Sequence, residues 1–263
     1  MKLKLAAWMT IPLVIFLFTA NAQTIGTNRL PQKTTASKLK AGTNAPVNTT
    51  TNLLPNTLTN QAPDTVTNTA PEIPKDNYTN SIGMKLLKVP GDFWAGQYEV
   101  TQGEYQQIIG SNPSAFNGDL HPVDNVSWND AMQFCLKLTA HEIKEKKLPE
   151  DFFYALPTEA QWETLVADTS LANAVTSQNR PRNGTATVGS LNANSLGLYD
   201  VRGNVMEFTL GDPSLPYRVL LGGSWQDRIE INLRTAFRFY ASPTDSRNTF
   251  GFRCILMRKP SAK

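Results

Sequence analysis

Apolar and polar positions divide the chain into a short apolar opening, a long stretch without period, and a region of regular patterns. The opening is an apolar run over residues 5–19. No sustained period of two or 3.6 follows until residues 83–91 (GMKLLKVPG), which alternate and then turn as an opening strand does. The pattern predicts that the folded part begins near Ser81.

Three segments of the folded part carry a helix-start signal, a hydroxyl side chain followed three positions later by a side chain that satisfies a backbone amide. After the second signal, Ala131, Phe134, Cys135 and Leu138 recur at the i, i+3, i+4, i+7 spacing of one helix face. This spacing predicts a helix that ends before Pro149 and places Cys135 on its core side. The three signals are Thr101 with Glu104, Ser127 with the weaker partner Asp130, and Thr158 with Gln161.

From residue 180 onwards the chain reads as short strands and turns, punctuated by glycines. Few helices and many irregular turns predict an α+β domain that is rich in loops.

The first 22 residues have the pattern of a secretory signal peptide. Lys2 and Lys4 precede the apolar run, and residues 20–22 (ANA) form a small-x-small cleavage site before Gln23. The alternative is an uncleaved membrane anchor, although the run is shorter than the ~20 residues that a spanning helix needs. Cleavage predicts an exported protein, periplasmic, secreted or associated with the cell envelope, with no membrane span left.

Residues 23–80 are rich in Thr, Asn, Pro and Ala and contain almost no aromatic residues. Too little apolar surface is available there to offset the entropy of ordering, so we expect a flexible linker. The net charge of +3 comes from the signal and the linker, because the folded part is near neutral. We therefore expect no nucleic-acid partner.

Five short motifs follow one another in the folded part. They are LPTEAQWE (156–163), GLYD (197–200), GNVME (203–207), GGSW (222–225) and GFRC (251–254). In this order they resemble the formylglycine-generating enzyme, or sulfatase-modifying factor, domain. The resemblance covers residues 81–258, leaves a tail at 259–263, and implies a C-type-lectin-like fold.

The two cysteines, Cys135 and Cys254, suit a disulfide in an exported protein. Their positions match a structural disulfide of the resembled family, and the alternative is a pair of buried free thiols. A bridge of this length stabilises by about 4–5 kcal/mol in the chain-entropy model, less any strain.

The resemblance implies copper(I) chemistry, in which two cysteines after the Gly-Gly-Ser-aromatic motif bind copper(I). Oxygen activated at the copper then oxidises a cysteine in a sulfatase-type Cys-x-Pro-x-Arg peptide to formylglycine. The corresponding residues 226–234 (QDRIEINLR) contain no cysteine, histidine or methionine. Copper(I) requires soft thiolates, so we expect no copper here. Met206 also stands where the family usually has Trp.

Three polar positions match the family's pocket: Ser224, Arg234 and Arg238. The two arginines are four apart on an expected strand, and would face the same side. They would either bind an anion or pair with Asp227 and Glu230.

For calcium, the resemblance implies the side chains of Asp200 and Glu207 and the carbonyls of Gly203 and Val205. Such a mixture of oxygens suits a hard cation. Alternatively, the two acids only cap turns. With two histidines in the chain, we expect no histidine-rich metal site.

The favoured hypothesis is a non-catalytic binding or scaffolding module at the cell envelope, whose partner is an exported protein or peptide. The alternatives are a formylglycine-generating oxidase acting on a sulfatase, and a different reaction on the same scaffold.

Overall fold

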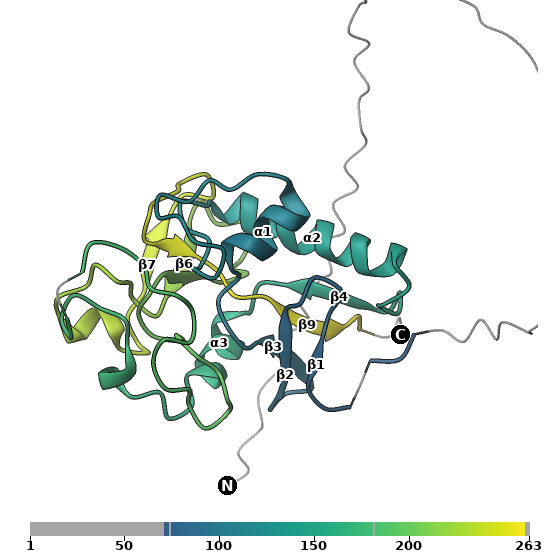
Figure 1. The fold of residues 1–263 in the computed structure, drawn as a ribbon, viewed down its shortest axis with the longest axis horizontal. Helices are drawn as coiled ribbons and strands as arrows, with labels where there is room; N and C mark the ends of the chain where they lie inside the picture. The colour runs from purple at the N-terminus through teal and green to yellow at the C-terminus, as the bar shows by residue number, and fades with distance from the viewer. Residues whose placement is uncertain (1–70, 74, 181, 261–263) are drawn as a thin grey trace, which may run out of the picture. The chain divides into compact units, whose positions relative to one another are not determined.

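The computed structural model describes residues 71–73, 75–180 and 182–260. The predicted signal peptide, the predicted linker up to residue 70 and the last three residues lie outside this part (Figure 1). The folded part begins before the predicted Ser81, because Tyr78 and Thr79 form a strand that pairs with residues 85–86, and Trp94 donates to the carbonyl of Asp76. The other boundaries predicted for signal, linker, domain and tail stay predictions.

Two sheets form the framework of the described part. The first has the strand order β1-β2-β3-β9-β4 and is antiparallel throughout. The second has the order β7-β6-β5-β8, with β5 and β8 parallel. Because β9 lies between β3 and β4, the last strand of the chain completes the first sheet. The strands are β1 (Tyr78–Thr79), β2 (Lys85–Val89), β3 (Phe93–Gly96), β4 (Phe152–Ala155), β5 (Met206–Phe208), β6 (Arg218–Leu221), β7 (Phe239–Ala241), β8 (Phe250–Gly251) and β9 (Ile255–Arg258).

Each α-helix begins where the hydroxyl signal predicts it. Thr101, Ser127 and Thr158 cap α1 (Gln102–Ile109), α2 (Trp128–Lys144) and α3 (Glu159–Val166). All three caps are complete capping boxes, including the one with Asp130. The prediction that the second helix ends before Pro149 is confirmed. Two short 3-10 helices, η1 (Leu171–Asn173) and η2 (Glu230–Leu233), lie in the loops.

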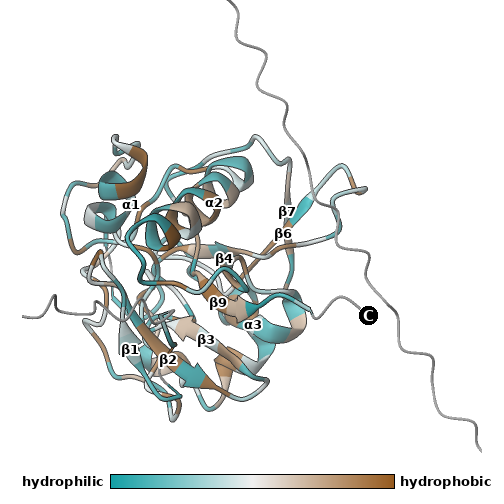
Figure 2. Ribbon diagram, turned by 90° about the vertical axis from the view of Figure 1, so that its right-hand side faces the viewer, coloured by the Kyte–Doolittle hydropathy of each residue, from teal (hydrophilic) through white to brown (hydrophobic). Residues whose placement is uncertain are grey.

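Alternate side chains of the first sheet point to opposite sides, and each side of the sheet packs against a core of its own. Trp94, Tyr154 and Leu256 point into the larger core, which α1 and α2 complete. These two helices lie side by side in both views (Figures 1 and 2). The neighbouring residues Ala95 and Ile255 point into a second core under α3. The sheet thus supports helices on both faces.

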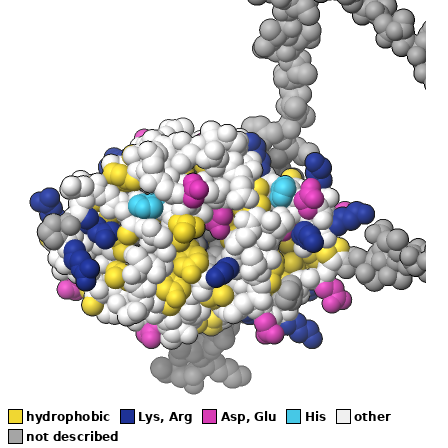
Figure 3. Space-filling view, viewed as in Figure 1, with side chains coloured by type: hydrophobic (Ala, Val, Ile, Leu, Met, Phe, Trp, Pro, Cys, Tyr) yellow, Lys and Arg dark blue, Asp and Glu magenta, His cyan; other side chains and the backbone are white. Residues whose placement is uncertain are grey.

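The loop-rich character is concentrated between α3 and β5, where the described residues 171–180 and 182–205 form turns, bends and one 3-10 helix. The predicted α+β, loop-rich architecture is confirmed. None of the described helices is long and apolar enough to cross a membrane. On the face that Figure 3 shows, basic and acidic side chains are interspersed.

Candidate functional site

A buried ion pair joins four of the five sequence motifs. Arg253 and Glu207 are both fully buried, with 2.7 Å between Nη2 and Oε1. Arg253 also donates to the carbonyls of Gly96 and Tyr199, at 2.8 and 2.7 Å. Trp162 of α3 donates from Nε1 to the other oxygen of Glu207 at 2.9 Å. The pair therefore ties the two sheets and α3 together.

Two further carboxylates lie in the same buried region. Glu99 accepts from the Asn204 side chain at 2.7 Å and from the Val205 amide at 3.0 Å. Asp200 accepts from the Gly189 amide at 2.6 Å. Burial raises the pKa of Glu99 well above its usual range, and it raises the pKa of Asp200 as well. Arg253 pairs with Glu207 alone, and its charge partly opposes the rise in the pKa of Glu99 and of Asp200.

One of the four predicted calcium ligands, Glu207, has no carboxylate oxygen available for a cation. The structure holds Asp200, Gly203, Val205 and Glu207 in one buried turn and strand, but the arginine and the tryptophan already bind both carboxylate oxygens of Glu207. The described residues also form no group of three or more acids, histidines or cysteines arranged for a metal. These residues as arranged do not fit calcium at Glu207, and calcium at Asp200 and the two carbonyls stays a prediction.

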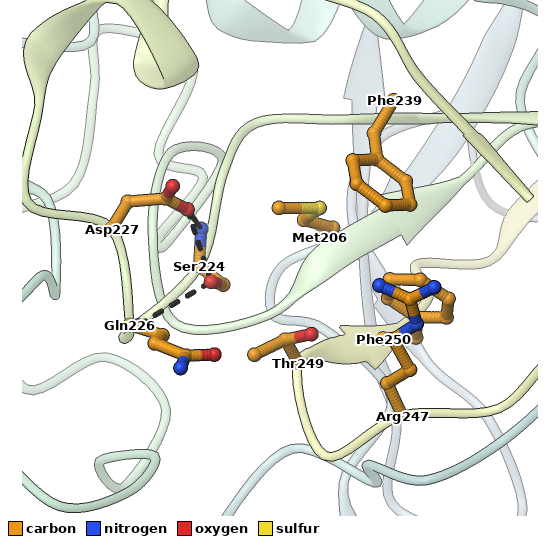
Figure 4. A pocket seen from close by; sticks show the side chains of 8 residues that line it. All are labelled: Met206, Ser224, Gln226, Asp227, Phe239, Arg247, Thr249 and Phe250. Atoms are coloured by element: carbon orange, nitrogen blue, oxygen red, sulfur yellow. Dashed lines mark hydrogen bonds between the residues drawn. The ribbon is translucent and has the colours of Figure 1, made fainter.

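A pocket of about 160 Å³ opens beside the second sheet (Figure 4). Its apolar wall is made by Met206, Phe239 and Phe250. The polar residues that line it are Ser224, Gln226, Asp227, Arg247 and Thr249. The pocket therefore combines one small apolar wall with one cation and several hydrogen-bonding groups.

Ser224 lines this pocket, but its hydroxyl already makes two hydrogen bonds within the protein. It donates to Asp227 at 3.0 Å and accepts from the Gln226 amide at 3.3 Å. Asp227 also accepts from the Ser224 amide at 2.7 Å and from Asn232 at 2.5 Å. These bonds close the turn after the GGSW motif. A serine nucleophile needs a base positioned to take its proton, and no histidine lines the pocket.

The other two pocket candidates lie elsewhere. Arg234 follows η2 and pairs with Glu230 at 3.5 Å, one of the two acids predicted as partners. Arg238 instead pairs with Glu159 and Glu163 of α3, at 2.6 and 2.5 Å. Neither arginine lines the pocket, and neither lies on a strand. The prediction of one shared strand face is wrong because the chain turns between the two residues.

The two cysteines meet in the larger core, away from the pocket lining. Cys135 of α2 and Cys254, directly before β9, are buried, with their Sγ atoms 3.5 Å apart as free thiols. The predicted core position of Cys135 is confirmed. Burial raises the pKa of the Cys254 thiol well above its usual range, which makes it a poor nucleophile. The disulfide stays a prediction.

Sequence reasoning missed part of the site. Arg247, Thr249 and Phe239 line the pocket but belong to no motif, so their spacing carried no signal. For Arg253 the sequence did carry a signal, because this residue belongs to the GFRC motif. What the pattern did not show was its partner, 46 positions away in sequence.

The described residues form a loop-rich α+β domain, with a buried ion pair between its two sheets and a small pocket beside the second sheet. The sequence profile of the sulfatase-modifying factor enzyme 1-like domain matches residues 51–258. The chain belongs to this family, and the prediction from its motifs, including the C-type-lectin-like fold, is confirmed.

Several curated proteins are similar in sequence. The chaperone protein LppX of Paenibacillus barcinonensis is 29% identical over 51% of this chain and 69% of its own length. The formylglycine-generating enzyme of Mus musculus is 27% identical over 58% of this chain and 49% of its own. The kinase Pkn1 of Chlamydia trachomatis matches 51% of this chain at 29% identity, although the chain spans only 24% of that protein.

Solved structures share the fold. Treponema denticola variable protein 1 covers 70% of this chain and 94% of its own, with a TM-score of 0.55 and 24% identity. The match with PvdO from Pseudomonas aeruginosa covers 71% of this chain and 99% of the PvdO chain, with a TM-score of 0.55 and 18% identity. At these identities the likeness concerns the fold alone.

Proposed function

We propose that this member of the family is an exported binding or scaffolding module of the cell envelope, without formylglycine-generating activity. The observation that carries the proposal is the chemistry of the pocket, which is lined by no cysteine and no histidine. The copper(I) chemistry of the family needs soft thiolates, and the one sulfur-containing side chain that lines the pocket is the thioether of Met206. The chain's two cysteines are buried against one another in the core.

Two further observations support a binding role. The hydroxyl of Ser224 is held in a turn, so the pocket offers no activated nucleophile. One relative is named a chaperone protein, which supports a partner that is itself a protein or peptide. Export is supported by the basic, apolar and small-residue pattern of residues 1–22.

The alternative function is an oxidase of the formylglycine-generating type. Its support is the 27% identity with the mouse enzyme over 58% of this chain. It would require Cys135 and Cys254 to leave the core and act as copper ligands. Both are at most 1% exposed and lie in the larger core, Cys135 on α2 and Cys254 directly before β9, which favours the binding role.

Copper(I) binding separates the two functions. We expect the purified, reduced protein to remove no copper(I) from a chromogenic chelator such as bicinchoninate, because its only thiols are buried. The mouse formylglycine-generating enzyme serves as the positive control. Removal of one equivalent by the wild type, lost in a Cys135→Ala, Cys254→Ala variant, would show that the core thiols bind copper and would contradict the proposal.

A further inference from the structure

The pocket has an uncommitted polar edge. Gln226, Arg247 and Thr249 lie along one side of it in Figure 4. Within the described residues, none of these three side chains makes a hydrogen bond or an ion pair, whereas Ser224 and Asp227 are bonded to one another. The pocket therefore presents a carboxamide, a guanidinium and a hydroxyl to whatever enters it.

Arg247 is held in place without using its donors. Its guanidinium carbon lies 5.3 Å from the ring centre of Phe239 and 5.2 Å from that of Phe250. Stacking of a cation on aromatic faces orients the group through the ring quadrupole. Stacking leaves the N–H groups of the guanidinium available as donors. Two of them can bind the two oxygens of one carboxylate. The exposed arginine is thus positioned for an anion.

The apolar wall sets the size of the ligand. Met206 and Phe250 are 7% and 1% exposed and give the pocket an apolar floor. A cavity of ~150 Å³ holds a molecule as large as benzene, and this pocket measures about 160 Å³. One aliphatic side chain of an amino acid fills such a space.

The charges around the pocket favour a monoanion. Arg247 is its one cationic lining residue, and the carboxylate of Asp227 lies across the pocket from it (Figure 4). Asp227 repels a second negative charge, and phosphate carries close to two at neutral pH. A carboxylate beside Arg247 avoids this repulsion.

We propose that this pocket binds a peptide carboxylate next to a small aliphatic side chain, with the carboxylate on Arg247 and the side chain against Met206 and Phe250. The carboxylate comes either from the peptide's C-terminus or from an acidic side chain. The inference rests on the proposed binding function and names the chemistry of its ligand.

The test is an NMR titration of the full chain, following the backbone amides of Gln226 and Thr249. Three probes are used: acetyl-Gly-Gly-Leu with a free C-terminus, the same peptide as its C-terminal amide, and acetyl-Gly-Glu-Leu amide. We expect saturable chemical-shift changes at millimolar concentration with at least one of the two carboxylate peptides. The Leu amide should bind more weakly than that peptide, by about tenfold or more, because it lacks the charged hydrogen bond to Arg247. The first and third probes tell which carboxylate is preferred.

Two arginine variants make the test specific. Arg247→Gln should weaken carboxylate binding by about tenfold and leave amide binding unchanged. The matched control is Arg258→Gln, which removes an exposed arginine that stacks on Phe152 at 4.8 Å on the other sheet. Equal binding of all three probes, carboxylate binding that Arg247→Gln leaves unchanged, or no shift at about 10 mM peptide would overturn the inference. Each of these results would leave the copper experiment unaffected.

Discussion

Glu207→Gln is expected to lower the free energy of unfolding by about 3–5 kcal/mol, the usual loss when one partner of a buried ion pair is removed. Arg253 would keep its charge at zero exposure. A glutamine has one acceptor oxygen where the carboxylate has two, so its amide donor would face either Arg253 or the Nε1–H of Trp162, which now donates to Glu207 Oε2. Denaturant unfolding of both proteins measures the difference.

Two controls identify the cause. Glu163→Gln removes a 45% exposed partner of Arg238 and should change the free energy of unfolding by less than about 1 kcal/mol. Repeating the measurement in EDTA separates arginine pairing from calcium binding. Destabilisation of equal size with and without EDTA supports the pairing. An effect that disappears in EDTA would assign Glu207 to calcium and contradict our description of the pair.

Oxidation of Cys135 and Cys254 is expected to have an effect of similar size. The thiols are 3.5 Å apart and 119 positions apart in sequence, so a bridge would close a long loop. Such a loop stabilises by about 4–5 kcal/mol in the chain-entropy model, with strain reducing the gain. We expect the protein recovered from an oxidising compartment to be destabilised by about 3–4 kcal/mol when reduced.

Thiol titration in denaturant, before and after reduction, provides the check. No reactive thiol before reduction and two afterwards would support the bridge. A Cys135→Ala, Cys254→Ala variant should show no dependence of stability on reductant. Two reactive thiols in the exported, unreduced protein would mean that the cysteines remain free and that the predicted disulfide is wrong.

Local signals in the sequence predicted local structure well. The hydroxyl at Thr101, Ser127 and Thr158 begins a helix in each case, because a capping box involves residues only three apart. The helical period also placed Cys135 in the core. The motif order identified the family, because short motifs in a set order are specific in combination.

Features that join distant segments were not predictable in the same way. Arg238 bonds to Glu159 and Glu163, more than seventy positions earlier, and nothing in its neighbourhood shows this. Arg247 enters the pocket only because β7 and β8 bring Phe239 and Phe250 together, with ring centres 5.5 Å apart. Such contacts depend on the packing of the two sheets and not on spacing along the chain.

The most direct test of the central claim, that this family member binds but does not oxidise, is an oxidation assay on the purified full chain. The protein is incubated with copper(I), oxygen and a Cys-x-Pro-x-Arg peptide, and the peptide's mass is followed for conversion of its thiol to an aldehyde. We predict no conversion by a protein whose folding is verified, under conditions in which the mouse formylglycine-generating enzyme turns over. Conversion that depends on the protein would contradict the claim and return Cys135 and Cys254 to consideration as catalytic groups.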